Sequence, residues 1–217
     1  MGFVLTSADY VNYIKNAYEL IKSREDYVTE LDLATGDGDH WSNMNMGFEK
    51  LVEKSGELSK LPASDMLKEI GKTMMAVIGG SSGVLYGSAY LGAAKAIKGK
   101  ETISRDDLGA VLKAMLDAII QRGQSQENHK TMIDSLAPAV RAYETALKEN
   151  KNDAELCESV KQAAVDGAEN TKNMEAVKGR ATYQANKGVG HLDPGAVTMS
   201  YQIGALMDYI RTEKLAG

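Results

Sequence analysis

Residues 64–100 read SDMLKEIGKTMMAVIGGSSGVLYGSAYLGAAKAIKGK, a pattern typical of two helices joined by a glycine-rich turn. The first half carries an apolar stripe at intervals of three and four residues, the spacing of one helix face; it consists of Leu67, Ile70, Met74 and Val77. The second half is almost entirely small or apolar, so we expect a helix buried among other helices. This stretch therefore predicts a helical core.

The same spacing continues along the rest of the chain. Further helices are predicted at 6–23, from near Asn43, and at 104–123, 131–150, 153–174 and 193–214. Residues that favour helix starts precede most of the predicted helices, namely Thr6, Ser64, Ser104, Asp153 and Asp193. With only three prolines and short β-branched runs, the sequence predicts an all-α fold of about eight amphipathic helices, with residues 1–217 as a single domain.

Composition excludes several classes of protein. The net charge is −5 and the lysines are scattered, which argues against a nucleic-acid partner. No segment approaches the roughly 20 apolar residues of a membrane span. Cys157 is the only cysteine, so a disulfide within the chain and a thiolate metal cluster are both excluded. We therefore expect a cytoplasmic protein with no membrane or nucleic-acid partner.

An acidic cluster surrounds two glycines in residues 34–48, ATGDGDHWSNMNMGF. Asp32, Asp37 and Asp39 bring three carboxylates within eight residues. Like charges this close raise each other's pKa unless a cation lies between them. Oxygen ligands suit a hard divalent ion, Mg²⁺ before Ca²⁺. The alternative is that these aspartates cap the next helix and remain solvated.

Two other stretches carry groups that bind phosphate. In residues 79–83, GGSSG, bare backbone N–H groups and two hydroxyls stand at the start of a predicted helix, which favours an anion. A close crossing of helices is the alternative reason for such small residues. Arg180, in a Gly-Arg-Ala turn, offers a fixed charge for phosphate oxygens, although it could be an ordinary surface residue. Together with the carboxylates, these parts could hold a metal-bound polyphosphate.

Five stretches resemble a known family, in the family's order: LDLATGDGDHWSNMNMGF, GGSSGVLYG, HKTMIDSLAPA, GRATY and GHLDPGA. They are similar to motifs of the nucleotide-binding (ADP-binding) L subunit of bacterial dihydroxyacetone kinases, and the resemblance covers nearly the whole chain. It implies a barrel of eight antiparallel helices with a nucleotide and metal site at one rim. Where this chain has Trp41, the family usually has glycine.

The resemblance also implies roles for individual residues. Asp32, Asp37 and Asp39 would hold two Mg²⁺ ions that bridge the phosphates of ADP or ATP, and with Arg180 they would form the catalytic set. The residues that would contact the nucleotide are His40, Trp41, Ser42, Asn43, Gly80, Ser81, Ser82, Gly123, Met132, Arg180, Asp193, Pro194 and Gly195.

Partners follow from the same resemblance. In the family, dihydroxyacetone is bound by a histidine of a separate K subunit, and His40, His129 and His191 do not match the setting of that histidine. The resemblance thus implies a K subunit as partner, and a phosphocarrier M subunit of the phosphotransferase system that recharges bound ADP. A homodimer of this chain is also possible.

Several alternatives remain at this point. One is an ATP-dependent kinase module for a related small ketose, or the nucleotide domain of a fatty acid kinase. The others are a regulatory nucleotide-binding paralogue without catalysis and a purely structural helical bundle.

Overall fold

A computed structural model describes residues 2–215, and that part of the chain is almost entirely helical. Its ten α-helices are α1 (Ser7–Lys22), α2 (Glu25–Thr35), α3 (His40–Glu53), α4 (Ser55–Leu58), α5 (Ala63–Val77), α6 (Gly80–Ala96), α7 (Arg105–Gly123), α8 (Ile133–Lys148), α9 (Asp153–Asn170) and α10 (Pro194–Tyr209). The remaining elements are the 3₁₀ turns η1 (Thr171–Asn173) and η2 (Arg180–Tyr183), the π-helical turn η3 (Ile210–Lys214), and the strands β1 (Val4–Leu5) and β2 (Ile103–Ser104), which pair antiparallel.

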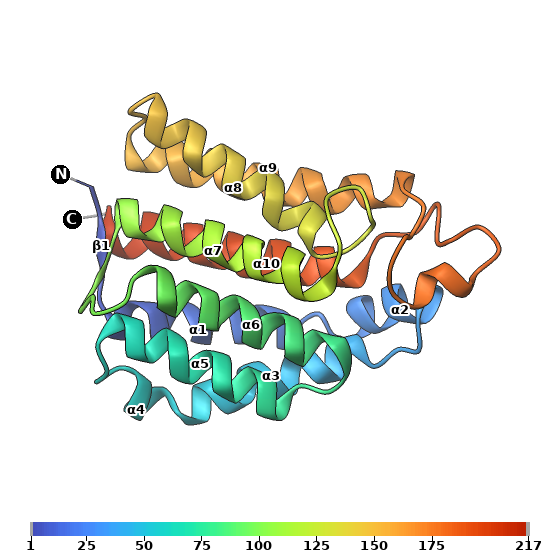
Figure 1. The fold of residues 1–217 in the computed structure, drawn as a ribbon, viewed down its shortest axis with the longest axis horizontal. Coiled ribbons are helices and arrows are strands. Elements are labelled where there is room, and N and C mark those ends of the chain that lie inside the picture. The colour runs from blue at the N-terminus through green and yellow to red at the C-terminus, as the bar shows by residue number, and fades with distance from the viewer. Residues whose placement is uncertain (1, 216–217) are drawn as a thin grey trace.

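The eight long helices pack in a closed ring. In the order α1, α3, α5, α6, α7, α8, α9, α10 each helix packs against the next, and α10 returns to α1 (Figure 1). The predicted all-α fold is therefore confirmed. Of the sixteen residues of α10, fourteen are buried, which makes it the most enclosed helix of the core. Among residues 2–215 no helix has both the length and the apolar character needed to cross a bilayer.

Close crossings on α6 explain its small residues. A β-carbon at Gly87 would lie 3.0 Å from the carbonyl oxygen of Gly71 on α5, and one at Gly92 would lie 3.0 Å from that of Ala114 on α7. Real side chains rarely fit at such distances, so glycine lets α6 pack tightly between α5 and α7. The expectation of a buried helix in this stretch is confirmed.

Two helix starts differ from the sequence-based expectation. Thr6 and Ser104 cap their helices as predicted, and each does so in a capping box. Ser64, however, lies inside α5, because the helix begins directly after Pro62, and its hydroxyl accepts the N–H of Gly99 at 3.3 Å. At α9 the cap is Asn152, whose side chain accepts from the N–H of Glu155 at 2.9 Å.

Helix α2 was not predicted. Its buried residues are only Val28, Asp32 and Thr35, so the stripe that marks the other helices is mostly polar here. Asp32, the first aspartate of the acidic cluster, therefore lies on the last turn of a helix that the sequence did not predict.

The barrel has two different ends. The turns α2–α3, α5–α6, α7–α8 and α9–α10 gather at one end, on the right in Figure 1, and we call it the loop end. The paired strands β1 and β2 lie at the opposite end, as does the C-terminal end of α10. Every stretch singled out as a phosphate or metal site falls at the loop end.

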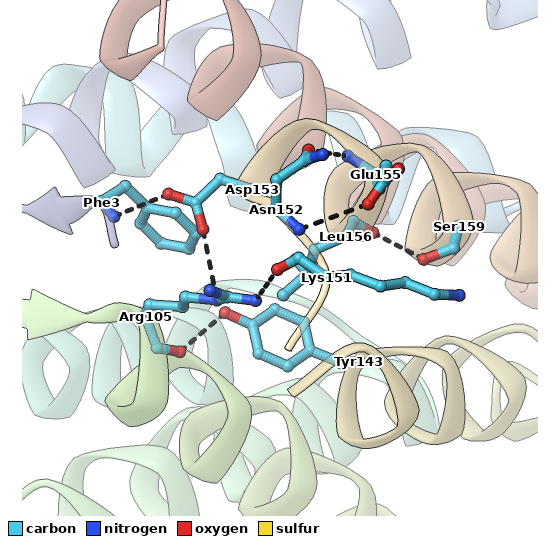
Figure 2. A network of polar contacts seen from close by, with 9 residues as sticks. All are labelled: Phe3, Arg105, Tyr143, Lys151, Asn152, Asp153, Glu155, Leu156 and Ser159. Atoms are coloured by element: carbon cyan, nitrogen blue, oxygen red, sulfur yellow. Dashed lines mark hydrogen bonds and ion pairs between the residues drawn. The ribbon is translucent and has the colours of Figure 1, made fainter. Parts of the chain in front are cut away.

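A polar network fastens the opposite end (Figure 2). Arg105 forms an ion pair with Asp153 at 3.2 Å and donates to the carbonyl oxygen of Lys151 at 2.5 Å. Asp153 also accepts the N–H of Phe3 at 3.0 Å, and the hydroxyl of Tyr143 donates to the carbonyl oxygen of Arg105 at 2.7 Å. The network thus ties the N-terminal segment, the start of α7 and the α8–α9 turn together.

We expect the substitution Asp153→Ala to lower the free energy of unfolding by about 1.5 kcal/mol, because it removes the partner of a mostly buried guanidinium and a hydrogen bond to the Phe3 N–H. Urea unfolding would measure the change. Asp117→Ala is the matched control, since its pair with Lys113 is exposed and should contribute less than about 0.5 kcal/mol. Equal losses in the two variants would contradict the importance of the network.

Candidate active site

Three carboxylates converge where α2 turns into α3. Ligand oxygens of Asp32, Asp37 and Asp39 all lie within 4.8 Å of one another; Asp32 is buried and the other two are exposed. Between them, Gly38 adopts a left-handed φ of 80°, and a β-carbon at Gly36 would collide with the carboxylate of Asp32. The glycines therefore allow a turn tight enough to bring the charges together.

His40, the first residue of α3, connects this cluster to the core. Its backbone N–H donates to Asp32 at 3.0 Å, and its Nε2 lies 2.8 Å from the hydroxyl of Thr198 on α10. Burial lowers the pKa of His40, although the nearby Asp32 and Asp39 act in the opposite direction. The hydrogen bond between the imidazole and Thr198 holds the start of α3 against α10.

A cavity of about 620 Å³ opens at the loop end. The three aspartates of the cluster do not line it, but His40 does, and the backbone N–H of His40 donates to Asp32, so the cluster lies next to the cavity wall. Eight residues that the sequence singled out for nucleotide contact line it: His40, Ser81, Ser82, Gly123, Met132, Asp193, Pro194 and Gly195. The two serines lie in the first turn of α6, where backbone N–H groups have no partner within the helix. Residues far apart in the sequence thus form one cavity, one end of which is the first turn of α6.

Other lining residues were not foreseen. Leu85, Ile119 and Ile133 give the cavity an apolar wall, while Arg122, Lys130 and Lys178 add positive charge. The sequence offered little signal for the apolar residues, because they look like ordinary members of helix stripes. Lys130 lies inside the stretch HKTMIDSLAPA but had been given no role.

Trp41, Ser42, Asn43 and Gly80 were also predicted to contact the nucleotide, but they do not line the cavity. The indole N–H of Trp41 donates to the carbonyl oxygen of Ile21 at 3.0 Å, so this side chain packs between α3 and α1. Ser42 donates to the carbonyl oxygen of Asp39 at 2.9 Å, and Asn43 accepts the N–H of Gly79 at 3.2 Å. Gly80 begins α6 with a left-handed φ of 63°. These residues shape the surroundings of the carboxylates and of the serines.

Arg180 reaches the acidic cluster from a distant segment. It begins η2 and forms an ion pair with Asp37 at 2.6 Å. Nearby, the side chain of Gln184 donates to the carbonyl oxygen of Ala34 at 2.6 Å. The structure therefore brings the cationic turn and the carboxylates together, as the sequence led us to expect, although they lie far apart along the chain.

Asp193 lines the cavity and also caps α10. Its carboxylate caps α10 by accepting the N–H of Ala196 at 2.7 Å. Burial raises the pKa of Asp193 to about 7, even though this hydrogen bond and the ammonium of Lys130 act to lower it. Asp193 therefore joins the start of α10 to the cavity wall, with the ammonium of Lys130 close enough to favour its charged form.

The sequence model of a protein family, the DAK2 domain, matches residues 34–208 of the chain. The chain belongs to the DAK2 domain family. This DAK2 chain is 31% identical to the ADP-binding subunit DhaL of the PEP-dependent dihydroxyacetone kinase of Escherichia coli, over 93% of the chain and 96% of that protein. It is 35% identical to a corresponding subunit of Listeria innocua, over 91% of the chain and 93% of that protein.

This DAK2 chain also resembles a solved structure in its fold. The dihydroxyacetone kinase of C. freundii in complex with AMP-PNP and Mg²⁺ superimposes with a TM-score of 0.70 and 25% identity, over 91% of this chain. The DAK2 chain spans only 33% of the length of that kinase. The resemblance to dihydroxyacetone kinase subunits that the motifs predicted is confirmed.

Proposed function

We propose that this chain is the L subunit of a dihydroxyacetone kinase of the type that depends on the phosphotransferase system. It holds ADP or ATP with two Mg²⁺ ions, transfers a phosphoryl group to dihydroxyacetone bound on a K subunit, and is recharged by a phosphocarrier M subunit. The observation that carries the proposal is the carboxylate cluster beside a cavity that ends on the first turn of α6. The proposal takes residues 1–217 as one domain.

The donor set fits magnesium. Asp32, Asp37 and Asp39 offer only oxygen, which suits a hard divalent ion, and their ligand oxygens are close enough to share ions. Thiolate and imidazole ligands, which zinc and copper prefer, do not join the cluster. Bound Mg²⁺ would neutralise phosphate charge and polarise the phosphoryl oxygens.

The other side chains supply binding and positioning. Ser81 and Ser82 offer hydroxyls and backbone N–H groups to phosphate oxygens, and the apolar wall with Leu85 and Ile119 suits the flat face of a base. Arg180, already beside the cluster, places a fixed positive charge where a phosphoryl group would develop charge during transfer. Catalysis in this proposal consists of positioning and electrostatic stabilisation.

A separate subunit for the acceptor rests on the family resemblance, in which a histidine of the K subunit holds the substrate. Of the three histidines here, His40 is buried and bonded to Thr198, and Nδ1 of His129 lies 3.2 Å from the hydroxyl of Ser125. His191 is exposed and is not among the residues that line the cavity. The PEP-dependent subunits of E. coli and L. innocua, which match over nearly their full length, support the route of recharging.

Nucleotide and magnesium content of the purified, extensively dialysed protein tests this function. We expect close to one ADP per chain, with Mg²⁺, to survive dialysis, and to be phosphorylated when PEP and the phosphocarrier proteins are added. An empty protein that binds ATP reversibly would contradict the recharging step and favour an ATP-dependent kinase for a small ketose. Failure to bind either nucleotide would contradict the whole proposal and favour a regulatory or structural role.

A further inference from the structure

Residues 171–193, which join α9 to α10, form a loop closed at its base, and we call it the site loop. Three backbone N–H groups donate between its two halves: that of Asp193 to the side-chain hydroxyl of Thr171 at 2.9 Å, that of Gly190 to the carbonyl oxygen of Lys172 at 2.7 Å, and that of Ala176 to the carbonyl oxygen of Lys187 at 2.9 Å. The tip of the site loop carries Arg180 and Gln184 to the α2–α3 turn. The base therefore holds together the two halves of the loop that carries Arg180.

A single lysine from another segment joins both halves of that base. Lys130 is only 2% exposed, and its ammonium donates to the carbonyl oxygens of Thr171 and His191, one from each end of the site loop. Its stem lies beside Gly188, where a β-carbon would come within 3.0 Å of Cε. The position of the ammonium thus fixes the two ends of the loop relative to each other.

Burying the ammonium of Lys130 costs free energy, and the neighbouring carboxylates offset only part of that cost. Burial lowers the pKa of Lys130, while Asp193 and Asp134 act to raise it. An apolar side chain of similar length would avoid the desolvation cost, so general packing does not explain a lysine here.

The backbone that presents Lys130 is also held in an unfavourable conformation. Gln124, Asn128 and Lys130 have left-handed φ values of 46°, 69° and 59°. Residues other than glycine rarely adopt this backbone conformation. The buried carboxylate of Asp134 maintains this conformation by accepting the N–H groups of Asn128 and of Thr131, the latter at 2.7 Å. The α7–α8 turn is therefore built to direct one ammonium between the ends of the site loop.

We propose that Lys130 is a positioning residue that locks the base of the site loop and thereby holds Arg180 beside the carboxylate cluster. Loss of the ammonium leaves two carbonyl oxygens without their donor and lets the halves of the loop separate. The effect on the loop stands on its own, whereas the effect on ligand affinity rests on the proposed function.

Hydrogen exchange tests the locking directly, without any ligand. In Lys130→Met we expect the backbone N–H groups of Ala176, Gly190 and Asp193 to exchange about tenfold faster or more, because a charged donor is lost from the base. Exchange in α7 and α8 should be unchanged. Lys130→Arg, which can donate to both carbonyls, should restore most of the protection, and Lys113→Met is the exposed control.

Unchanged exchange at the base in Lys130→Met, or equal acceleration throughout the chain, would contradict the proposal. Should Lys130→Met fail to fold, the wild-type protein decides the question. The three base N–H groups must then exchange as one unit, at a rate different from those of α9 and α10. Independent rates for the three groups would overturn the locking role.

A double-mutant cycle with Arg180→Ala tests whether Lys130 acts through the loop. By calorimetry, we expect Lys130→Met to weaken binding of ADP with Mg²⁺ about tenfold in the wild-type background, and to change it little when Arg180 is already alanine. Equal losses in both backgrounds would mean that Lys130 contacts the nucleotide itself and would overturn the proposal. If wild-type protein binds no nucleotide, the proposed function fails, while the exchange experiment still decides the role of Lys130.

Discussion

Replacing Asp37 by asparagine should abolish magnesium-dependent retention of ADP, with Mg²⁺ affinity falling on the order of a hundredfold, because the charge of the ligand set controls the affinity of such sites. Asp37 is one of three carboxylates whose ligand oxygens lie within 4.8 Å, and it is exposed, so the substitution should not disturb the core. Calorimetric titration with Mg²⁺ in the presence of ADP, and nucleotide content after dialysis, would measure the loss.

Asp26→Asn is the matched control for this prediction. Asp26 is an exposed aspartate on the first turn of α2, outside the cluster. Circular dichroism should show the same helix content in both variants. Retention of ADP by Asp37→Asn at the wild-type level would refute the assignment of the metal site.

Removing the guanidinium in Arg180→Ala should slow phosphoryl transfer on the order of a hundredfold, or about 2.7 kcal/mol of barrier, because a preorganised cation stabilises the charge that develops during transfer. Arg180 lies 2.6 Å from Asp37, at the edge of the cluster. The rate of dihydroxyacetone phosphate formation in the reconstituted complex, at saturating acceptor, is the appropriate measurement.

Lys187→Ala is the control on the same loop, since its ion pair with Glu175 lies among exposed residues. Arg180→Ala leaves all three carboxylates intact, so Mg²⁺ binding without nucleotide should persist, in contrast to Asp37→Asn. A wild-type rate for Arg180→Ala would return this arginine to the role of a surface charge.

The eight helices of the ring could be predicted because each has an apolar face or is apolar all round, a property that sequence spacing records directly. Helix α2 could not, since its inward residues are Val28, Asp32 and Thr35, and two of these are polar. Its burial depends on neighbours that only the folded chain provides. The misplaced caps at Ser64 and Asp153 have a similar origin, because both side chains bond to distant segments.

The polar parts of the candidate site could be predicted because aspartates, serines and an arginine in glycine-rich turns have few other reasons to cluster. Its apolar wall could not, because Leu85 and Ile119 do not differ in sequence from residues of the core. The role of Lys130 also escaped prediction, since it depends on the juxtaposition of Thr171 and His191 with a turn some forty to sixty residues away.

The arrangement of the two ends of the barrel has a practical and an evolutionary consequence. Because β1 and η3 lie at the end remote from the carboxylates, a tag, a solid support or another domain joined there would leave the cavity mouth open (Figure 1). The C. freundii kinase contains a matching region within a chain about three times as long. Because β1 and η3, the first and last described elements, share this end, the barrel is suited to gene fusion without covering the cavity.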